Sequence, residues 1–330
     1  MVYIAVAGGS GMVGQEIIDA LVAKGKHQIV LLSRKDAPRE TLPDGVKWTK
    51  TTYDVAHLVE VLRGVDTVLS FVAGPADPTN KAQEDTQKNL IDAAIQAGVR
   101  RFAPSEWASA GFDHMFWYNY KSDIRNYLIE VNKDKKVLEY TLFQPGIFTN
   151  YLTYPFKSAK RIQQLGLPFN YHERHAVIVD GHEDAKITLT TVQDLARIVA
   201  VAVEHEQEWP RVSGMNGGNL TIRQVIELGE KVRGGPFTVE KLKAEDVKAG
   251  VLKTSRVSKA THPSIPEEER EAAAPVLMAG ILMGFSSGVF EVSDEWNRLL
   301  PDYKFTQPED FLTKAWAEID AGATEVSIEV

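Results

Sequence analysis

The chain has 330 residues, of which 44% are hydrophobic and 25% charged, enough to bury one large core or two unequal ones. A formal net charge of −8 disfavours a nucleic-acid-binding surface, because such a surface needs clustered lysine and arginine; small molecules are the expected partners. The sequence contains no cysteine, which excludes disulfides, thiolate metal sites and cysteine nucleophiles.

The N-terminus carries an apolar run that is too short for a signal peptide and has no basic residues before it. No stretch approaches the roughly 20 apolar residues that a membrane span needs. We therefore expect a cytoplasmic protein, a monomer or homodimer, that binds neither membrane nor nucleic acid.

Strand and helix patterns alternate along the first half of the chain. Tyr3 to Ala7 is continuously apolar, glycines follow, and Met12 to Ala23 has apolar residues at helical spacing, which predicts a buried strand, a turn and a helix. Further strands are expected at Gln28 to Ser33, Lys47 to Thr51, Thr67 to Val72, Arg101 to Ala103 and Glu139 to Phe143. Further helices are expected at Val55 to Leu62, Gln83 to Gln96 and Tyr118 to Val131. This alternation predicts a parallel sheet covered on both faces.

The rhythm changes in the second half. The segment from Tyr151 to Asp180 is expected to be irregular, and helices are expected at Leu189 to Glu204 and Ile222 to Val232. A proline- and glutamate-rich loop, Pro263 to Glu271, leads into an apolar helix from Ala272 to Met283, which we interpret as a lid.

Together these patterns predict an α/β chain with a Rossmann-type doubly wound parallel sheet and a smaller C-terminal α+β region. Residues 1–150 are expected to form an NADP-binding domain and residues 151–330 a substrate-binding cap, part of which can return to the sheet. In open α/β folds, ligands bind beyond the carboxyl ends of the strands.

The string Gly8-Gly9-Ser10-Gly11-Met12-Val13-Gly14 lies between the first expected strand and helix. Backbone N–H groups and the positive helix end can meet a pyrophosphate there with no Cβ in the way. Two glycine spacings fit, G-x-G-x-x-G from Gly9 and G-x-x-G-x-x-G from Gly8, and the second is typical of short-chain dehydrogenase relatives. A purely structural glycine turn is the alternative.

The residues at the end of the second expected strand bear on the choice of cofactor. An NAD enzyme usually presents a carboxylate there to the ribose 2′-hydroxyl, whereas this chain has Ser33, Arg34 and Lys35, which favour the 2′-phosphate of NADPH. Solvated loop charges are the alternative for the basic pair, and Asp36 tempers the preference. Asp54 either accepts from the adenine amino group or caps a helix.

Four strings together resemble the isoflavone-reductase-like, or NmrA-like, branch of the atypical short-chain dehydrogenases, and looser likeness extends through most of the chain. They are the glycine turn, Gln87-Lys88-Asn89-Leu90-Ile91-Asp92-Ala93-Ala94, Val99-Arg100-Arg101-Phe102-Ala103-Pro104-Ser105-Glu106-Trp107 and Tyr120-Lys121-Ser122-Asp123-Ile124-Arg125. The resemblance implies an NADPH-dependent reductase of small, often phenolic or polyketide-like metabolites.

The resemblance also implies that one lysine, Lys121, is the essential catalytic side chain and contacts the cofactor. The Tyr-x-x-x-Lys pair of ordinary short-chain dehydrogenases is absent because position 117 is Trp117. An ammonium near the nicotinamide can donate a proton to a developing alkoxide or phenolate, and burial would lower its pKa toward neutrality. Lys121 and Arg125 share a helix face. From spacing alone, an ordinary solvated lysine is the alternative.

Other family positions complete the expected site. Ala73 and Gly74 should let the cofactor approach the backbone closely, and Phe148 resembles the family's aromatic residue beside the nicotinamide. Substrate contacts are expected from Ser105, Glu106, Tyr118, Phe148 and Tyr151, although a structural turn or simple packing could equally explain the first three.

His172, Glu173 and His175 form a tight cluster, but the spacing is loop-like and no second cluster supports it. We therefore expect no metal there and interpret these residues as substrate-pocket or surface groups. The family also contains proteins that resemble the nitrogen-metabolite regulator, which bind dinucleotide as redox sensors and control a protein partner without turnover. The presence of Lys121 in its family string favours the enzyme over the sensor.

Overall fold

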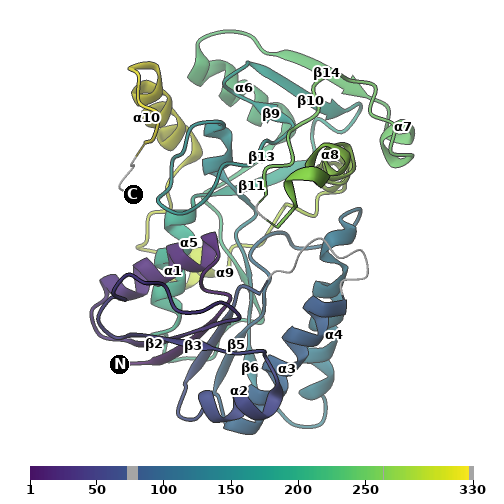
Figure 1. Ribbon diagram of the computed structural model, residues 1–330. Helices are drawn as coiled ribbons and strands as arrows, with labels where there is room; N and C mark the ends of the chain where they lie inside the picture. The colour runs from purple at the N-terminus through teal and green to yellow at the C-terminus, as the bar shows by residue number, and fades with distance from the viewer. Residues whose placement is uncertain (73–80, 263, 327–330) are drawn as a thin grey trace. The chain divides into compact units, whose positions relative to one another are not determined.

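The computed structural model describes residues 1–72, 81–262 and 264–326, which fall into two compact units (Figure 1). The first unit comprises Met1–Trp107, Trp117–Phe143 and Leu195–Ser213. The second comprises Ala108–Phe116, Gln144–Asp194 and Gly214–Val330. No helix among the described residues combines the length and the apolar composition needed to cross a membrane.

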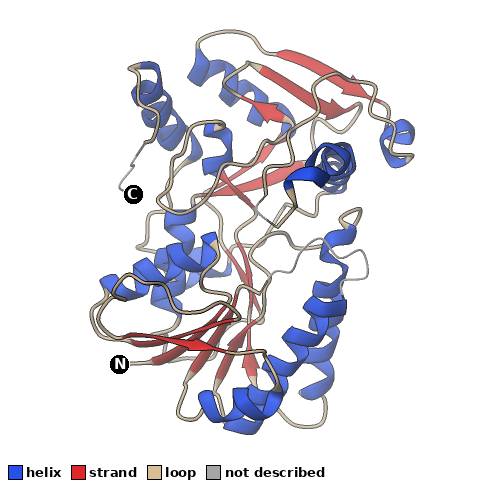
Figure 2. Ribbon diagram, in the orientation of Figure 1, coloured by secondary structure: helices blue, strands red, loops and turns tan. Residues whose placement is uncertain are grey.

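The first unit is built on a six-stranded parallel sheet in the order β3-β2-β1-β4-β5-β6 (Figure 2). The strands are β1 (Tyr3–Ala7), β2 (Gln28–Ser33), β3 (Val46–Lys50), β4 (Thr67–Ser70), β5 (Arg101–Ala103) and β6 (Glu139–Tyr140). The strand order reverses between β1 and β4, and in such sheets the carboxyl ends at that point form the ligand crevice. The predicted Rossmann-type sheet is confirmed.

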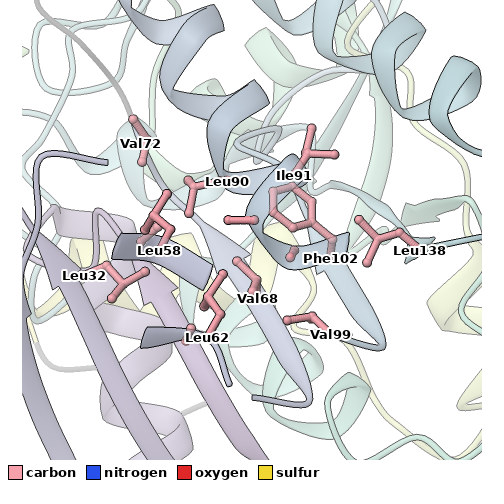
Figure 3. Packing of buried hydrophobic residues seen from close by; sticks show 14 of the residues in the cluster. Leu32, Leu58, Leu62, Val68, Val72, Leu90, Ile91, Val99, Phe102 and Leu138 are labelled. Atoms are coloured by element: carbon pink, nitrogen blue, oxygen red, sulfur yellow. The ribbon is translucent and has the colours of Figure 1, made fainter. Parts of the chain in front are cut away.

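Helices cover both faces of this sheet. They are α1 (Met12–Ala23), α2 (Val55–Val61), α3 (Lys81–Ala97), α4 (Asn119–Val131) and α5 (Val192–Ala202). Because side chains alternate along a strand, Ala5 and Ala7 point to the face that packs against α2, α3 and α4, while Val6 points to the face of α1. Figure 3 shows buried residues of this packing layer, among them Leu58 of α2, Leu62 directly after that helix, and Leu90 and Ile91 of α3.

The second unit contains shorter sheets. Its strands are β8 (Ile147–Phe148), β9 (Phe169–Asn170), β10 (His175–Val179), β11 (Lys186–Thr190), β13 (Gly218–Thr221) and β14 (Thr238–Leu242), which pair as β14-β10-β9 and β13-β11-β8. Its helices are α6 (Ile222–Arg233), α7 (Ala244–Lys248), α8 (Arg270–Ser287), α9 (Glu295–Leu299) and α10 (Pro308–Asp320). Strands β7 (Leu142–Gln144) and β12 (Val212–Gly214) pair with each other. In the described part of the chain, 3-10 helices lie at Phe116–Tyr118, Thr149–Thr153 and Glu267–Glu269.

Two predictions for the stretch from Tyr151 to Glu204 are wrong. The segment from Tyr151 to Asp180 is not irregular throughout, because it contains β10, whose five residues are all buried and which pairs in parallel with β14. The helix expected from Leu189 begins only at Val192, since Leu189 and Thr190 belong to β11.

The boundary before α5 has a local cause. The Thr191 hydroxyl accepts from the backbone N–H of Asp194 at 3.1 Å and donates to its carboxylate at 2.8 Å. This reciprocal pair is a helix N-cap, which separates strand from helix at Thr191.

The apolar helix expected at Ala272 to Met283 lies inside the longer α8. Arg270 and Glu271, which we expected in a loop, are helical, and the helix continues to Ser287. Gly288, with φ +76°, ends it in the left-handed conformation that favours glycine. Figure 1 shows α8 in green in the second unit.

Candidate functional site

The glycine turn connects β1 to α1 at the point where the strand order reverses. Gly8 has φ +71°, and its N–H donates to the backbone oxygen of Leu32 at 3.1 Å. A Cβ at this position would lie 2.8 Å from the carbonyl carbon and oxygen of Phe71. Gly8 is therefore required both by its backbone conformation and by the close approach of the chain after β4.

The later glycines of the turn have different roles. A Cβ on Gly14 would lie 2.9 Å from the Cα of Gly9, so Gly14 lets α1 approach the turn closely. A Cβ on Gly11 would meet only the Gly8 oxygen, at 3.2 Å. Gly11 is exposed, whereas Ser10, Met12 and Val13 are partly buried.

The first turn of α1 has the electrostatics of an anion site. Gly11 is the N-cap residue and no side chain caps this end of the helix. The first helical turn also contains no acidic residue. Since the N-terminal end of a helix carries a positive partial charge, these residues fit a dinucleotide pyrophosphate.

Tyr53 stabilises the glycine turn through hydrogen bonds of its hydroxyl group. Its hydroxyl donates to the backbone oxygen of Leu32 at 2.9 Å and accepts from the N–H of Gly8 at 3.2 Å. Tyr53 itself has φ +65°, which is uncommon for a residue other than glycine, and its backbone oxygen accepts from the side-chain amide of Asn89 at 3.0 Å. Burial raises the pKa of Tyr53 to about 12, so the hydroxyl stays protonated.

A small basic turn is formed by Ser33, the last residue of β2, and by Arg34 and Lys35, which follow it. The hydroxyl of Ser33 is buried and accepts from the N–H of Lys35 at 3.1 Å, which shapes the turn. Arg34 and Lys35 are exposed. Asp36, the residue that weakened the sequence argument for NADPH, forms an ion pair with Lys50 at 2.6 Å. Lys50 thus offsets the negative charge of Asp36 beside Arg34 and Lys35.

Asp54 is the N-cap of α2. Its carboxylate accepts from the backbone N–H of His57 at 2.9 Å and from the hydroxyl of Thr52 at 3.0 Å, and these hydrogen bonds lower its pKa. The capping role that the sequence left open is therefore present. Ala73 and Gly74, predicted to lie against the cofactor, are outside the described residues.

Lys121 is buried in the first turns of α4, with only 5% of its surface exposed. Its Nζ donates to the backbone oxygen of Glu106 at 2.6 Å and lies 3.9 Å from the centre of the Tyr118 ring. Burial lowers the pKa of Lys121 from 10.5 to about 8; the Glu106 carboxylate opposes this shift and Arg125 reinforces it. An ammonium in this range can both release and regain a proton near neutral pH.

Glu106 is held by Arg125 from the next turn of α4. The Nε and Nη2 atoms of Arg125 donate to the two carboxylate oxygens of Glu106 at 3.0 and 2.5 Å. The Glu106 side chain is 1% exposed, and that of Arg125 is 21% exposed. Lys121 and Arg125 thus share a helix face, as their spacing predicts, and both contact the same residue.

A continuous path of contacts links this lysine to the glycine turn. Trp107, which follows Glu106, stacks its ring on Phe71 with centroids 4.3 Å apart, and its indole N–H donates to Ser70 at 2.7 Å. The backbone of Phe71 in turn lies against Gly8. Lys121 and the turn therefore belong to the same edge of one sheet.

Ser105 is buried within the same unit, and its side chain hydrogen-bonds Tyr120. Phe148 and Tyr151 belong to the second unit, where their rings pack edge to face with centroids 5.6 Å apart. Their expected contacts with nicotinamide and substrate remain predictions.

The histidine cluster has structural partners. The ring of His172 packs against Phe156 and Trp316. His175 lies 3.1 Å from Arg256 and 3.4 Å from Glu173, and burial followed by the Arg256 charge lowers its pKa. No group of three potential metal ligands occurs among the described residues.

Sequence reasoning missed two residues of this site. Tyr53 was overlooked because a single tyrosine after a strand carries no spacing signal. Trp107 was quoted within a family string but was assigned no role, although its φ of +49° and its stacking place it between Glu106 and Phe71.

The sequence of this chain is similar to those of known proteins. The profile of the NmrA-like family matches residues 2–272. The oxidoreductase BOA1 of Botryotinia fuckeliana (strain B05.10) is 30% identical over 241 residues, which cover 71% of this chain and 77% of that protein. The bifunctional pinoresinol-lariciresinol reductase 2 of Thuja plicata is 25% identical over 264 residues, covering 74% and 80%.

Solved structures share the fold. The NADPH-dependent quinone oxidoreductase QOR2 of Escherichia coli, solved as a complex with NADPH, superposes with a TM-score of 0.67 at 21% identity. The superposition covers 95% of this chain and 99% of that one.

Proposed function

This chain belongs to the NmrA-like family, and on that premise we propose that it is an NADPH-dependent reductase of a small aromatic or polyketide-like metabolite, with Lys121 as the proton donor. The observation that carries the proposal is the burial of the Lys121 ammonium against the Glu106 carbonyl, on the sheet edge that also bears the glycine turn. A regulatory dinucleotide sensor needs the turn but not the lysine.

The residues of the turn fit NADPH. Gly8 to Gly14 and the uncapped start of α1 would hold the pyrophosphate, and Arg34 with Lys35 would hold the 2′-phosphate. Tyr53 would act indirectly, by fixing the N–H of Gly8 and the carbonyl of Leu32. When bound, the cofactor supplies a hydride to an electrophilic carbon of the substrate.

Lys121 supplies the proton that balances this transfer. As negative charge develops on the substrate oxygen, Nζ donates its proton and becomes a neutral amine. Burial favours that neutral form, whereas the Glu106 carboxylate favours the ammonium and so assists reprotonation from solvent. The Nζ of Lys121 lies over the Tyr118 ring, 3.9 Å from its centre, so an aromatic side chain borders the proton donor.

A binding titration followed by a substrate screen tests the proposal. The purified protein is titrated with NADPH and NADH, and NADPH oxidation is then followed over aromatic carbonyls, enones, quinones and benzylic ethers. We expect selective NADPH binding and turnover of at least one class, lost in Lys121→Ala. Binding without turnover across the panel contradicts the reductase and favours the sensor.

A further inference from the structure

We propose that Arg125 and Glu106 are positioning residues for Lys121: Arg125 holds the Glu106 carboxylate in a two-point ion pair, so that Glu106 meets the Lys121 ammonium through its neutral backbone carbonyl. The inference rests on the proposed function, because it assigns these residues to the proton donor of the same site. Glu106 thus uses two different acceptors: its carboxylate binds Arg125, and its backbone carbonyl binds Lys121.

The geometry of the carbonyl supports this role. The N–H of Glu106 donates to Pro104 at 2.8 Å, and the N–H of the next residue, Trp107, donates to Phe143 at 3.0 Å. The indole of Trp107 is held by Ser70 and by its stacking on Phe71. These hydrogen bonds on both sides of the Glu106 carbonyl hold its oxygen in the orientation that meets Lys121.

The geometry of the carboxylate explains why Arg125 is needed. A planar guanidinium matches a carboxylate at two points, which an ammonium cannot do. Here both oxygens of Glu106 accept from Arg125, and the carboxylate is almost completely buried. Without Arg125, this buried carboxylate could pair with Lys121, whose Nζ already lies at the backbone of the same residue.

This arrangement has a consequence for the acidity of Lys121. A direct lysine–carboxylate pair would hold the proton tightly, because opposite charges in a buried site favour both charged forms. With the carboxylate held by Arg125, burial dominates and the pKa of Lys121 falls, and the Glu106 charge limits the fall. Among the described residues, Glu106, Arg125 and the Tyr118 ring are charged or titratable groups that bear on Nζ.

An NMR titration of the full chain tests the inference without cofactor or substrate. Protein labelled with ¹³C-lysine is titrated, and the Cε resonance of Lys121 is identified by its absence in Lys121→Met. In Arg125→Met the midpoint of the Lys121 titration is expected to rise by about one pH unit or more, because the freed Glu106 carboxylate pairs with Lys121. In Glu106→Gln the midpoint is expected to fall, because the opposing charge is removed.

A matched control breaks another buried ion pair in the same unit. Glu139 binds Arg101 at 2.7 Å, and Arg101 begins β5 whereas Glu106 follows the end of that strand. Glu139→Gln should lower stability and leave the Lys121 midpoint unchanged. Arg125→Lys, which keeps the charge but cannot form the two-point pair, should raise the midpoint less than Arg125→Met and serves if the latter does not fold.

The outcomes separate this inference from the proposed function. Opposite shifts in the Arg125 and Glu106 variants support it, whether or not a substrate has been found. Midpoints that coincide with the wild-type value in both variants overturn it, even if turnover depends on Lys121. Absence of turnover in the substrate screen, with the opposite shifts present, contradicts the reductase alone.

Discussion

The ammonium nitrogen of Lys121 lies 2.6 Å from the backbone oxygen of Glu106, on a residue whose carboxylate is bound by Arg125. This contact places a buried cation beyond the carboxyl end of β5, in the unit that carries the glycine turn. Burying a charge costs free energy unless it is compensated, so a lysine kept in this position is better explained by chemistry than by stability.

Replacing Lys121 with methionine should stabilise the fold. The fall in the pKa of Lys121 from 10.5 to about 8 corresponds to about 3 kcal/mol of folding free energy lost below pH 8. The lost hydrogen bond offsets about 1 kcal/mol, so Lys121→Met should gain about 1–2 kcal/mol at pH 7 by urea unfolding.

If the buried Lys121 ammonium destabilises the fold, the free energy of unfolding of the wild type should rise with pH above about 8. Between pH 8 and 10.5 the unfolded chain keeps the lysine proton and the folded chain does not, so wild-type stability rises toward that of Lys121→Met. A gap between the two proteins that is equal at pH 7 and pH 10.5 would contradict a buried, destabilised ammonium.

The rate of reduction should depend on the same ionisation. If Lys121 donates the proton, kcat/KM is constant below a pKa of about 8 and falls about tenfold per pH unit above it. The profile is measured by NADPH oxidation between pH 6 and pH 10. A rate that rises through this range would assign Lys121 the role of a base.

Removing the hydroxyl of Tyr53 should weaken both the fold and cofactor binding. Tyr53→Phe leaves Gly8 and Leu32 without the bridging group, which should cost about 1 kcal/mol of stability and reduce NADPH affinity several-fold. Tyr127→Phe is the matched control, since it removes the hydroxyl that bonds Asp92 on α3. Equal NADPH affinity in both variants would remove Tyr53 from the cofactor site.

Arg34 should select the cofactor. Arg34→Ala is expected to weaken NADPH binding about 10- to 100-fold and NADH binding little, because a charge-assisted contact with the 2′-phosphate is lost. Arg39→Ala, an exposed arginine in the same loop, makes the same change in net charge. Calorimetric titrations with both cofactors decide: equal losses for NADPH and NADH would overturn the 2′-phosphate assignment.

The sheet and the glycine turn could be predicted because short local sequence patterns mark the strands and turns of the first unit. Continuous apolar runs mark buried parallel strands, and Gly8 and Gly98 mark turns that need a positive φ. The strand β10 was not predicted because its short apolar run follows a polar stretch, and the segment from Tyr151 to Asp180 as a whole shows no regular pattern. The start of α5 was misplaced because apolar residues continue from β11 into the helix, although Thr191 and Asp194 carry the capping signal.

The Lys121 site could be predicted only in part. Resemblance to a family identified the lysine, and spacing placed Arg125 on its face. The contact of both with Glu106 depends on how α4 packs beside the chain after β5, which no local pattern encodes. The support of the turn by Tyr53 depends likewise on a tertiary contact between residues far apart in the sequence.

The most direct test of the account is turnover by Lys121→Met at full cofactor occupancy. NADPH affinity is first measured for the wild type and the variant by calorimetry, and substrate-dependent NADPH oxidation is then compared with both saturated. We expect NADPH affinities within a few-fold of each other and a fall in turnover of at least about 100-fold in the variant. Wild-type turnover in Lys121→Met would contradict it.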